Sequence, residues 1–154
     1  MYPRINNPSD FDYLAEHLLK LRGILSAEEV CTPKNKDHNG EPMQYVIKCG
    51  LTTFTTISCL TGFESHVCRY FTLGSHDSVE AAVYLYDNNS GPFCRGGDSG
   101  SIIVDVLGKF VALTGGTGLT NSSDITFGSP MYWPWEIIKA QFPGANLYFD
   151  DDDN

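Results

Sequence analysis

Seven short segments rich in β-branched and aromatic residues occupy most of the chain after residue 42. They are residues 43–49, 51–60, 65–73, 81–86, 101–106, 110–114 and 125–132. Glycine, asparagine and serine, which are typical of tight turns, separate most of them, and Gly62 is expected in one such connection. Short strands at this spacing indicate an antiparallel sheet, closed into a barrel or packed as a sandwich. We therefore predict a mostly β fold, and 154 residues are enough for one such domain.

Helical patterns flank the predicted strands. Residues 10–22 carry an apolar stripe at helical spacing, and a shorter helical turn is expected from Ser26, with Glu29 three residues later. Residues 134–142 predict a closing helix with Pro134 at its first position. The expected organisation is an N-terminal helical segment over 1–30, a β-barrel with the closing helix over 31–149, and an acidic tail over 150–154.

Charge and cysteine content exclude several classes of partner. The chain has 10 Lys and Arg against 19 Asp and Glu and no basic stripe, so we expect no nucleic-acid partner. No window approaches eighteen uncharged apolar residues, and the first residues lack the apolar core of a signal peptide. We therefore expect no membrane partner and a cytoplasmic location. The five cysteines contain no CxxC pair, so no metal site is expected, and without an export signal no disulfide framework is expected either. We also expect no cofactor.

The segment from Gly96 to Ser101 carries the clearest chemistry in the sequence, Gly-Gly-Asp-Ser-Gly-Ser. A serine is a usable nucleophile when a tight turn exposes its hydroxyl and free backbone N–H groups face the developing oxyanion. Gly96 and Gly97 permit unusual backbone angles, and Gly100 removes bulk beside Ser99. Asp98 is expected to fix the turn through a buried hydrogen bond or ion pair.

The order of the histidines limits the class of hydrolase. All four, His17, His38, His66 and His76, precede Ser99, whereas the Gly-x-Ser-x-Gly elbow of α/β-hydrolases has its histidine after the serine. Histidine before serine is the chymotrypsin order. The alternative is an unrelated β protein, such as a sandwich, with a chance Gly-Asp-Ser-Gly turn.

Residues 97–142 resemble the Ser-bearing, C-terminal half of the trypsin-like serine peptidases. Gly-Asp-Ser-Gly-Ser is followed by the apolar strand 102–104, a hairpin at 107–109, the strand 110–116, the strand around 127–132 and a closing helix. The whole chain is also similar to uncharacterised trypsin-like proteins of mushroom-forming fungi. That similarity is carried by a Lys-x-Gly-x-Thr-Thr strand (Lys48, Gly50, Thr52, Thr53) and by segments 86–91 and 122–126.

The resemblance implies one six-to-seven-stranded antiparallel barrel of the trypsin-like type, with a helix at each end. It implies that Ser99 is the catalytic nucleophile and that the N–H groups of Gly97 and Ser99 form the oxyanion hole. Asp98, Gly96 and Gly100 would structure the loop. The substrate-binding residues would be Phe93 at the base of the specificity pocket and Thr114, Gly115 and Gly116 along a strand edge.

The chain also departs from this family. Trypsin-like enzymes place the histidine and aspartate of the triad on a first barrel, and here none of the four histidines lies in the matching Thr-Ala-x-His pattern. The family's loop aspartate pairs with a freshly cleaved Ile-Val terminus, whereas this chain starts Met1-Tyr2. We expect a serine-endopeptidase-like protein that is inactive alone, a pseudoenzyme or half of an enzyme. Its partners would be a peptide substrate or a complementary barrel or other protein. The alternative is a non-catalytic interaction module.

Overall fold

The computed structural model describes residues 19–37, 39–87, 90–117 and 125–147. Its strands and helices follow one another along the chain as β1 (Gly23–Ile24), α1 (Ala27–Cys31), β2 (Asn35–Lys36), β3 (Pro42–Gly50), β4 (Phe54–Phe71), β5 (Gly74–Leu85), β6 (Ile102–Asp105), β7 (Lys109–Thr117), β8 (Thr126–Pro130) and α2 (Tyr132–Gln141).

Strands β3 to β8 form a closed ring. The pairing order is β7-β6-β3-β4-β5-β8, and β8 pairs back with β7, every pair being antiparallel. The predicted mostly β fold with a single barrel is therefore confirmed. The sandwich is wrong, because the β7–β8 pairing joins the two ends of the sheet. Two short strands lie outside the ring, β2 antiparallel to β3 and β1 parallel to β7.

One strand, β4, replaces two of the predicted strands. Residues 51–60 and 65–73 were expected on either side of a turn at Gly62, but Phe54–Phe71 is continuous. The register with β5 shifts between Leu60 and Glu64, which marks a β-bulge. Gly62 lies in this bulge with φ +84°, and a Cβ atom there would lie 2.5 Å from the carbonyl oxygen of Cys31. Gly62 therefore allows a bend within one continuous strand.

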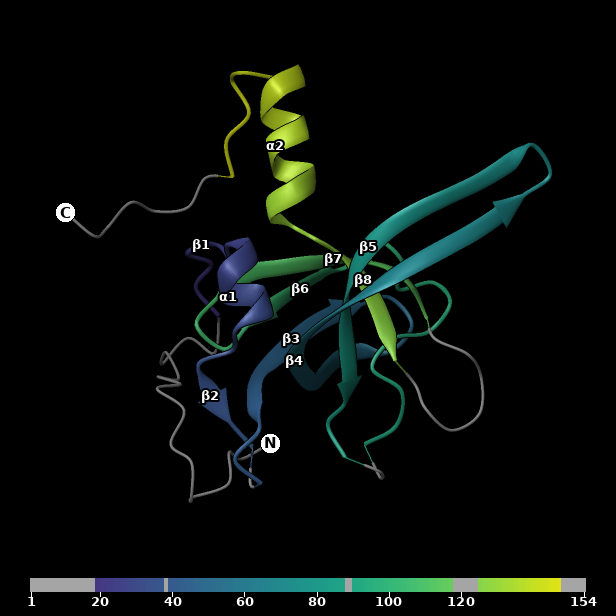
Figure 1. Ribbon diagram of the computed structural model, residues 1–154. Helices are drawn as coiled ribbons and strands as arrows, with labels where there is room; N and C mark the ends of the chain where they lie inside the picture. The colour runs from purple at the N-terminus through teal and green to yellow at the C-terminus, as the bar shows by residue number, and fades with distance from the viewer. Residues whose placement is uncertain (1–18, 38, 88–89, 118–124, 148–154) are drawn as a thin grey trace.

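The outer half of the β4–β5 hairpin is a two-stranded arm, residues 64–71 and 74–80, which extends away from the ring (Figure 1). β3 pairs with β4 only as far as Leu60, and β8 pairs with β5 only from Ala81 onward. Beyond those points the two strands of the arm pair only with each other among the described residues. The side chains of Tyr70, Phe71 and Leu73 are exposed near its tip.

The core fills the interior of the ring. It is formed by apolar side chains from α1, from the ring strands and from the segment before β6, including Val30, Val46, Leu60, Val83, Phe93, Ile103 and Val111. A smaller cluster of Val104, Phe110 and Met131 packs with Trp135 of α2 against the outside of the sheet.

The helices follow local signals with one correction. The capping box at Ser26 is confirmed: its hydroxyl accepts from the N–H of Glu29 at 3.2 Å, and α1 begins at the next residue. The closing helix begins at Tyr132, so Pro134 is its third residue and not its first. Pro134 is tolerated there because N–H groups in the first turn have no partner within a helix.

The remaining terminal predictions are tested only in part. Residues 10–18 of the predicted first helix and the acidic tail 150–154 lie outside the described residues. The described end of that helix, residues 19–22, is not helical. Neither helix in the described part of the chain has the length and apolarity needed to cross a membrane.

Candidate functional site

Ser99 lies in a tight loop between β5 and β6. Two turn hydrogen bonds shape this loop, from the N–H of Asp98 to the carbonyl of Arg95 and from the N–H of Ser101 to the carbonyl of Asp98, both 3.0 Å. Gly97 has φ +100°. That angle is disfavoured for residues with a side chain, and a Cβ atom at Gly97 would also overlap Oγ1 of Thr52. The loop therefore requires glycine at this position.

The far side of the loop is bonded to β7. The N–H of Gly100 donates to the carbonyl of Thr114 at 2.9 Å, and the N–H of Thr114 donates to the carbonyl of Ser101 at 2.9 Å. The hydroxyl of Thr114 adds a bond to the carbonyl of Asp98 at 2.7 Å. Ser99 is consequently bracketed by residues whose backbone is fixed against β7.

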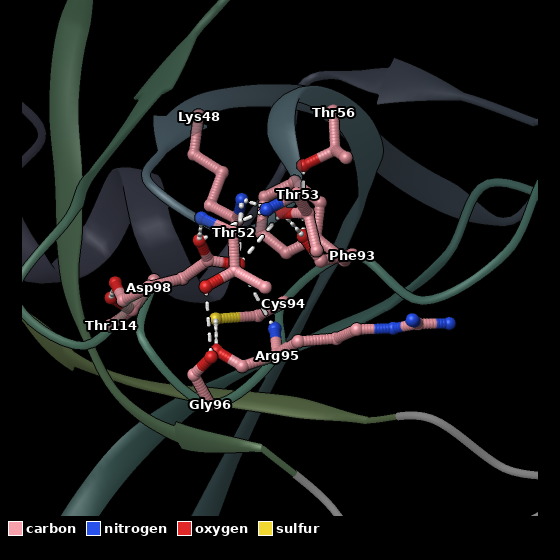
Figure 2. Close-up of polar contacts among 10 residues, drawn as sticks. All are labelled: Lys48, Thr52, Thr53, Thr56, Phe93, Cys94, Arg95, Gly96, Asp98 and Thr114. Atoms are coloured by element: carbon pink, nitrogen blue, oxygen red, sulfur yellow. Dashed lines mark hydrogen bonds and ion pairs between the residues drawn. The ribbon is translucent and has the colours of Figure 1, made fainter.

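The side chain of Asp98 holds the near side of the loop. Its carboxylate is fully buried and accepts four hydrogen bonds, drawn as dashed lines in Figure 2. Oδ1 accepts from the N–H groups of Thr52 at 2.7 Å and Thr53 at 3.2 Å. Oδ2 accepts from the hydroxyl of Thr53 at 2.7 Å and the N–H of Arg95 at 3.0 Å. The guanidinium of Arg95 points away from this carboxylate, so Arg95 acts through its backbone.

Lys48 supplies the opposite charge. Its ammonium lies 3.4 Å from Oδ2 of Asp98, and neither side chain has any exposed surface. The same ammonium donates to the hydroxyl of Thr53 and lies 5.5 Å from the centre of the Phe93 ring. A buried ion pair is favourable only when hydrogen bonds also satisfy its polar atoms, and here the hydroxyl of Thr53 bonds both the ammonium and the carboxylate.

These contacts keep the carboxyl of Asp98 ionised. Burial alone would raise its pKa, but the hydrogen bonds from Arg95, Thr53 and Thr52 outweigh burial and hold the pKa well below its usual range. The negative charge that pairs with Lys48 is thus present at any physiological pH.

The strand end that surrounds Asp98 coincides with the Lys-x-Gly-x-Thr-Thr pattern. Lys48, Thr52 and Thr53 contact the carboxylate directly, and at Gly50 a Cβ atom would overlap its Oδ1. We call Lys48, Gly50, Thr52, Thr53 and Asp98 the Asp98 cluster. Every residue of the pattern therefore contacts or makes room for the aspartate that holds the Ser99 loop.

Ser99 itself is exposed, and its hydroxyl has no hydrogen-bond partner in the described part of the chain. The same holds for the N–H groups of Gly97 and Ser99, neither of which meets an acceptor among residues 19–37, 39–87, 90–117 and 125–147. Gly96, also exposed, accepts a bond from the hydroxyl of Thr52 at 2.9 Å. The loop thus combines buried, fully bonded groups on one side with an exposed hydroxyl and two unbonded amides.

The other predicted site residues have different surroundings. Phe93 is 1% exposed and belongs to the core, with its carbonyl accepting from the hydroxyl of Thr56 at 2.8 Å. Its role at the base of a pocket stays a prediction. Thr114 is buried, Gly115 is exposed, and Gly116 pairs with Phe127 of β8.

The structure brings no histidine to Ser99 among the residues it describes. His66 and His76 are exposed residues of the arm, on β4 and β5. His17 and His38 lie outside the described residues. No group of three or more His, Cys, Asp or Glu side chains in the described chain is placed to hold a metal ion.

Sequence reasoning missed the role of Lys48. The signal was present in β3, where alternate residues Gln44, Val46 and Lys48 are all buried. A lysine at an inward position of an apolar strand needs a buried anion, and Asp98 was the acidic residue already expected to be buried.

Comparison with known proteins adds one structural likeness. No known family matches the sequence, and no curated protein does. Among solved structures, the chain is similar to the chymotrypsin of Cellulomonas bogoriensis, with a TM-score of 0.48 and 17% sequence identity. The match covers 84% of this chain and 57% of that chymotrypsin.

Proposed function

We propose that this chain is a serine-endopeptidase-like protein of the trypsin-like type, with Ser99 as the nucleophile and the N–H groups of Gly97 and Ser99 as the oxyanion hole. The observation that carries the proposal is the Ser99 loop. It has an exposed hydroxyl and two amides that bond to none of the described residues, and it rests on a buried aspartate with four hydrogen bonds and an ion pair.

The chemistry of acyl transfer explains why such a loop is useful. The tetrahedral intermediate carries a negative oxygen, and donors that are fixed beforehand stabilise it without reorganisation. One oxyanion donor contributes about 10²–10³ in rate. An amide bonded elsewhere in the fold could not serve, and none of the described residues offers an acceptor to the N–H groups of Gly97 and Ser99, which favours this role.

Lys48 has a specific part in this proposal. In the activated enzymes that the chain resembles, the loop aspartate pairs with a newly cleaved N-terminus. Here the ammonium of Lys48 is buried against Asp98. The loop would therefore take its shape on folding, with no proteolytic activation.

We further propose that the chain does not hydrolyse peptides by itself. Loss of the catalytic histidine costs about 10⁶ in kcat in serine proteases. The two described histidines, His66 and His76, lie on the arm, and in this proposal the general base comes from a complementary barrel or partner. The fungal trypsin-like proteins that the sequence resembles are, in this proposal, its relatives.

A second candidate function is a non-catalytic interaction module derived from the same fold. The observation that favours it is the arm, whose tip exposes Tyr70, Phe71 and Leu73. Exposed apolar residues on a two-stranded ribbon are typical of protein-binding surfaces.

A fluorophosphonate probe separates these functions when imidazole is offered as an external base. Ser99 Oγ would bond to phosphorus, fluoride would leave, and imidazole would take the hydroxyl proton. We expect intact-mass spectra to show no labelling of the chain alone and labelling of Ser99 when about 0.2 M imidazole is added, on the logic that a positioned base activates serine.

Two matched variants make the result specific. Ser99→Ala should abolish the rescued labelling, while Ser101→Ala, two residues away, should retain it. Rescued labelling that survives Ser99→Ala, or imidazole that produces no adduct, would refute the nucleophile assignment. Rapid labelling of Ser99 without imidazole would refute the claim that the chain lacks its own base.

A further inference from the structure

In the described part of the chain, the edge of β7 that faces the Ser99 loop has no strand partner beyond Thr114. β6 pairs with β7 no further than Ile102 opposite Leu113, and the Ser99 loop then covers Thr114. On the opposite edge, the register with β8 shifts between Thr114 and Gly116, so Gly115 has no partner on β8. An exposed strand edge of this kind binds an extended peptide by adding it as a further strand.

A charged pair from the arm lies directly behind Gly115. A Cβ atom built on Gly115 would lie 3.5 Å from Nη2 of Arg69 and 3.7 Å from Oε2 of Glu80. Gly115 has no side chain to cover the pair, and it is exposed. A peptide side chain that crosses Gly115 would therefore meet Arg69 and Glu80 at contact distance.

The two members of the pair differ in what they can offer a ligand. Glu80 is 2% exposed and is already bonded by Nη2 of Arg69 at 3.1 Å and by the hydroxyl of Ser78 at 2.8 Å. The side chain of Arg69 is 42% exposed, and only its Nη2 is bonded among the described residues. The nitrogen nearest Gly115, Nη2, is thus shared with Glu80, whereas Nε and Nη1 of Arg69 have no bond among the described residues and are left for a ligand.

We infer that Arg69 binds the carboxylate of an aspartate or glutamate side chain in a peptide held on the β7 edge. Arginine suits this role because its planar guanidinium can bond one carboxylate while other nitrogens bond a second. Glu80 fixes the guanidinium beforehand, which lowers the entropy cost of binding. The inference rests on the proposed function, because this edge is the one that would deliver a peptide to Ser99.

The overall charge of the chain would not by itself produce a preference for acidic peptides. The formal net charge is −9, so long-range electrostatics repel acidic peptides. Selectivity for an acidic residue would have to come from a local cation. A charge-assisted hydrogen bond at a partly exposed site corresponds to about tenfold in affinity.

The test is a titration of the ¹⁵N-labelled chain with three capped pentapeptides, in which glutamate, glutamine or lysine stands between pairs of alanines. The amide of Gly115 and the side-chain Nε–H of Arg69 are followed by NMR. We expect both signals to shift with the glutamate peptide, with an affinity about tenfold above that for the glutamine peptide.

Three variants assign the selectivity. The double variant Arg69→Gln/Glu80→Gln removes both charges without leaving a buried carboxylate unpaired, and it should bind the glutamate and glutamine peptides equally. Gly115→Val places a side chain over the pair and should also remove the selectivity. Lys139→Gln loses one positive charge on α2 and should retain it.

The outcomes distinguish this inference from the proposed function. Equal affinities in the native chain, selectivity that survives the double variant, or no binding of any peptide would each overturn it. The Ser99 labelling experiment is unaffected by those results. Conversely, Arg69-dependent binding with no labelling at Ser99 would support the peptide site and overturn the serine chemistry.

Discussion

Replacing Asp98 by Asn tests the buried network through folding stability. The change leaves the ammonium of Lys48 buried without its anion. It also turns an acceptor into an NH₂ group that must face a donor, either the N–H of Thr52 and Thr53 or the hydroxyl of Thr53 and the N–H of Arg95. No orientation of the amide satisfies all four donors.

The cost follows from these lost contacts. Removing one partner of a buried ion pair costs about 3–5 kcal/mol, and we expect about 3 kcal/mol because the amide keeps part of the hydrogen bonding of the carboxylate. For a chain of this length that corresponds to a fall in Tm of about 6–12 °C. Lys48→Met should cost less, about 1–2 kcal/mol, because Asp98 keeps its four hydrogen bonds.

Urea unfolding followed by circular dichroism measures both values, and Asp77→Asn on the exposed arm is the matched control. The control should change stability by less than about 0.5 kcal/mol. A cost for Asp98→Asn equal to that of the control would refute the network. So would a larger cost for Lys48→Met than for Asp98→Asn, because the hydrogen bonds would then not hold the carboxylate.

Three further outcomes follow from the structure. Gly108→Ala should lower stability by at least about 1–2 kcal/mol in the same unfolding assay, because φ is +84° and the new Cβ would overlap the carbonyl oxygen of Lys20; an unchanged midpoint would contradict this. The hydrogen bond from Lys109 lowers the pKa of Glu29 to about 2, so its contribution to stability is complete above about pH 4.3 and is lost as the pH falls towards 2. Thermal unfolding across that range should show a loss that Lys109→Gln reduces, and an identical pH profile in the variant would argue against the ion pair. Burial, with a smaller effect of a neighbouring aspartate, raises the pKa of Cys59 to about 11. The rate at which iodoacetamide alkylates Cys59, followed by peptide mass spectrometry, should therefore still rise above pH 9, and a plateau below pH 9 would contradict this.

The sequence predicted those parts of the fold that depend only on residues close together along the chain. The capping box at Ser26 and the hairpin at residues 107–109 form where the sequence places them. Gly62 shows the limit of such signals, because glycine marks a turn and a bulge equally well. Only the contact with the carbonyl of Cys31, which depends on the packing of α1 against β4, decides between them.

In the candidate site, too, the sequence predicted the local turn but not the contacts between distant strands. The glycines around Ser99 indicated an exposed serine on a tight turn, and the structure places Ser99 on one. The partner of Asp98 could not be predicted from its neighbours, because Lys48 lies on a strand that meets the loop only after the ring has closed. The position of Arg69 close to Gly115 likewise joins two strands far apart in the sequence, each with a β-bulge that the local sequence does not predict.

A crystal structure of the chain phosphonylated on Ser99, prepared with imidazole as the external base, tests the central claim most directly. The measured quantities are the distances from the phosphonyl oxygen to the backbone nitrogens of Gly97 and Ser99. Our account predicts that both are about 2.7–3.1 Å. An adduct whose oxygen points to solvent, with either amide turned away, would contradict it.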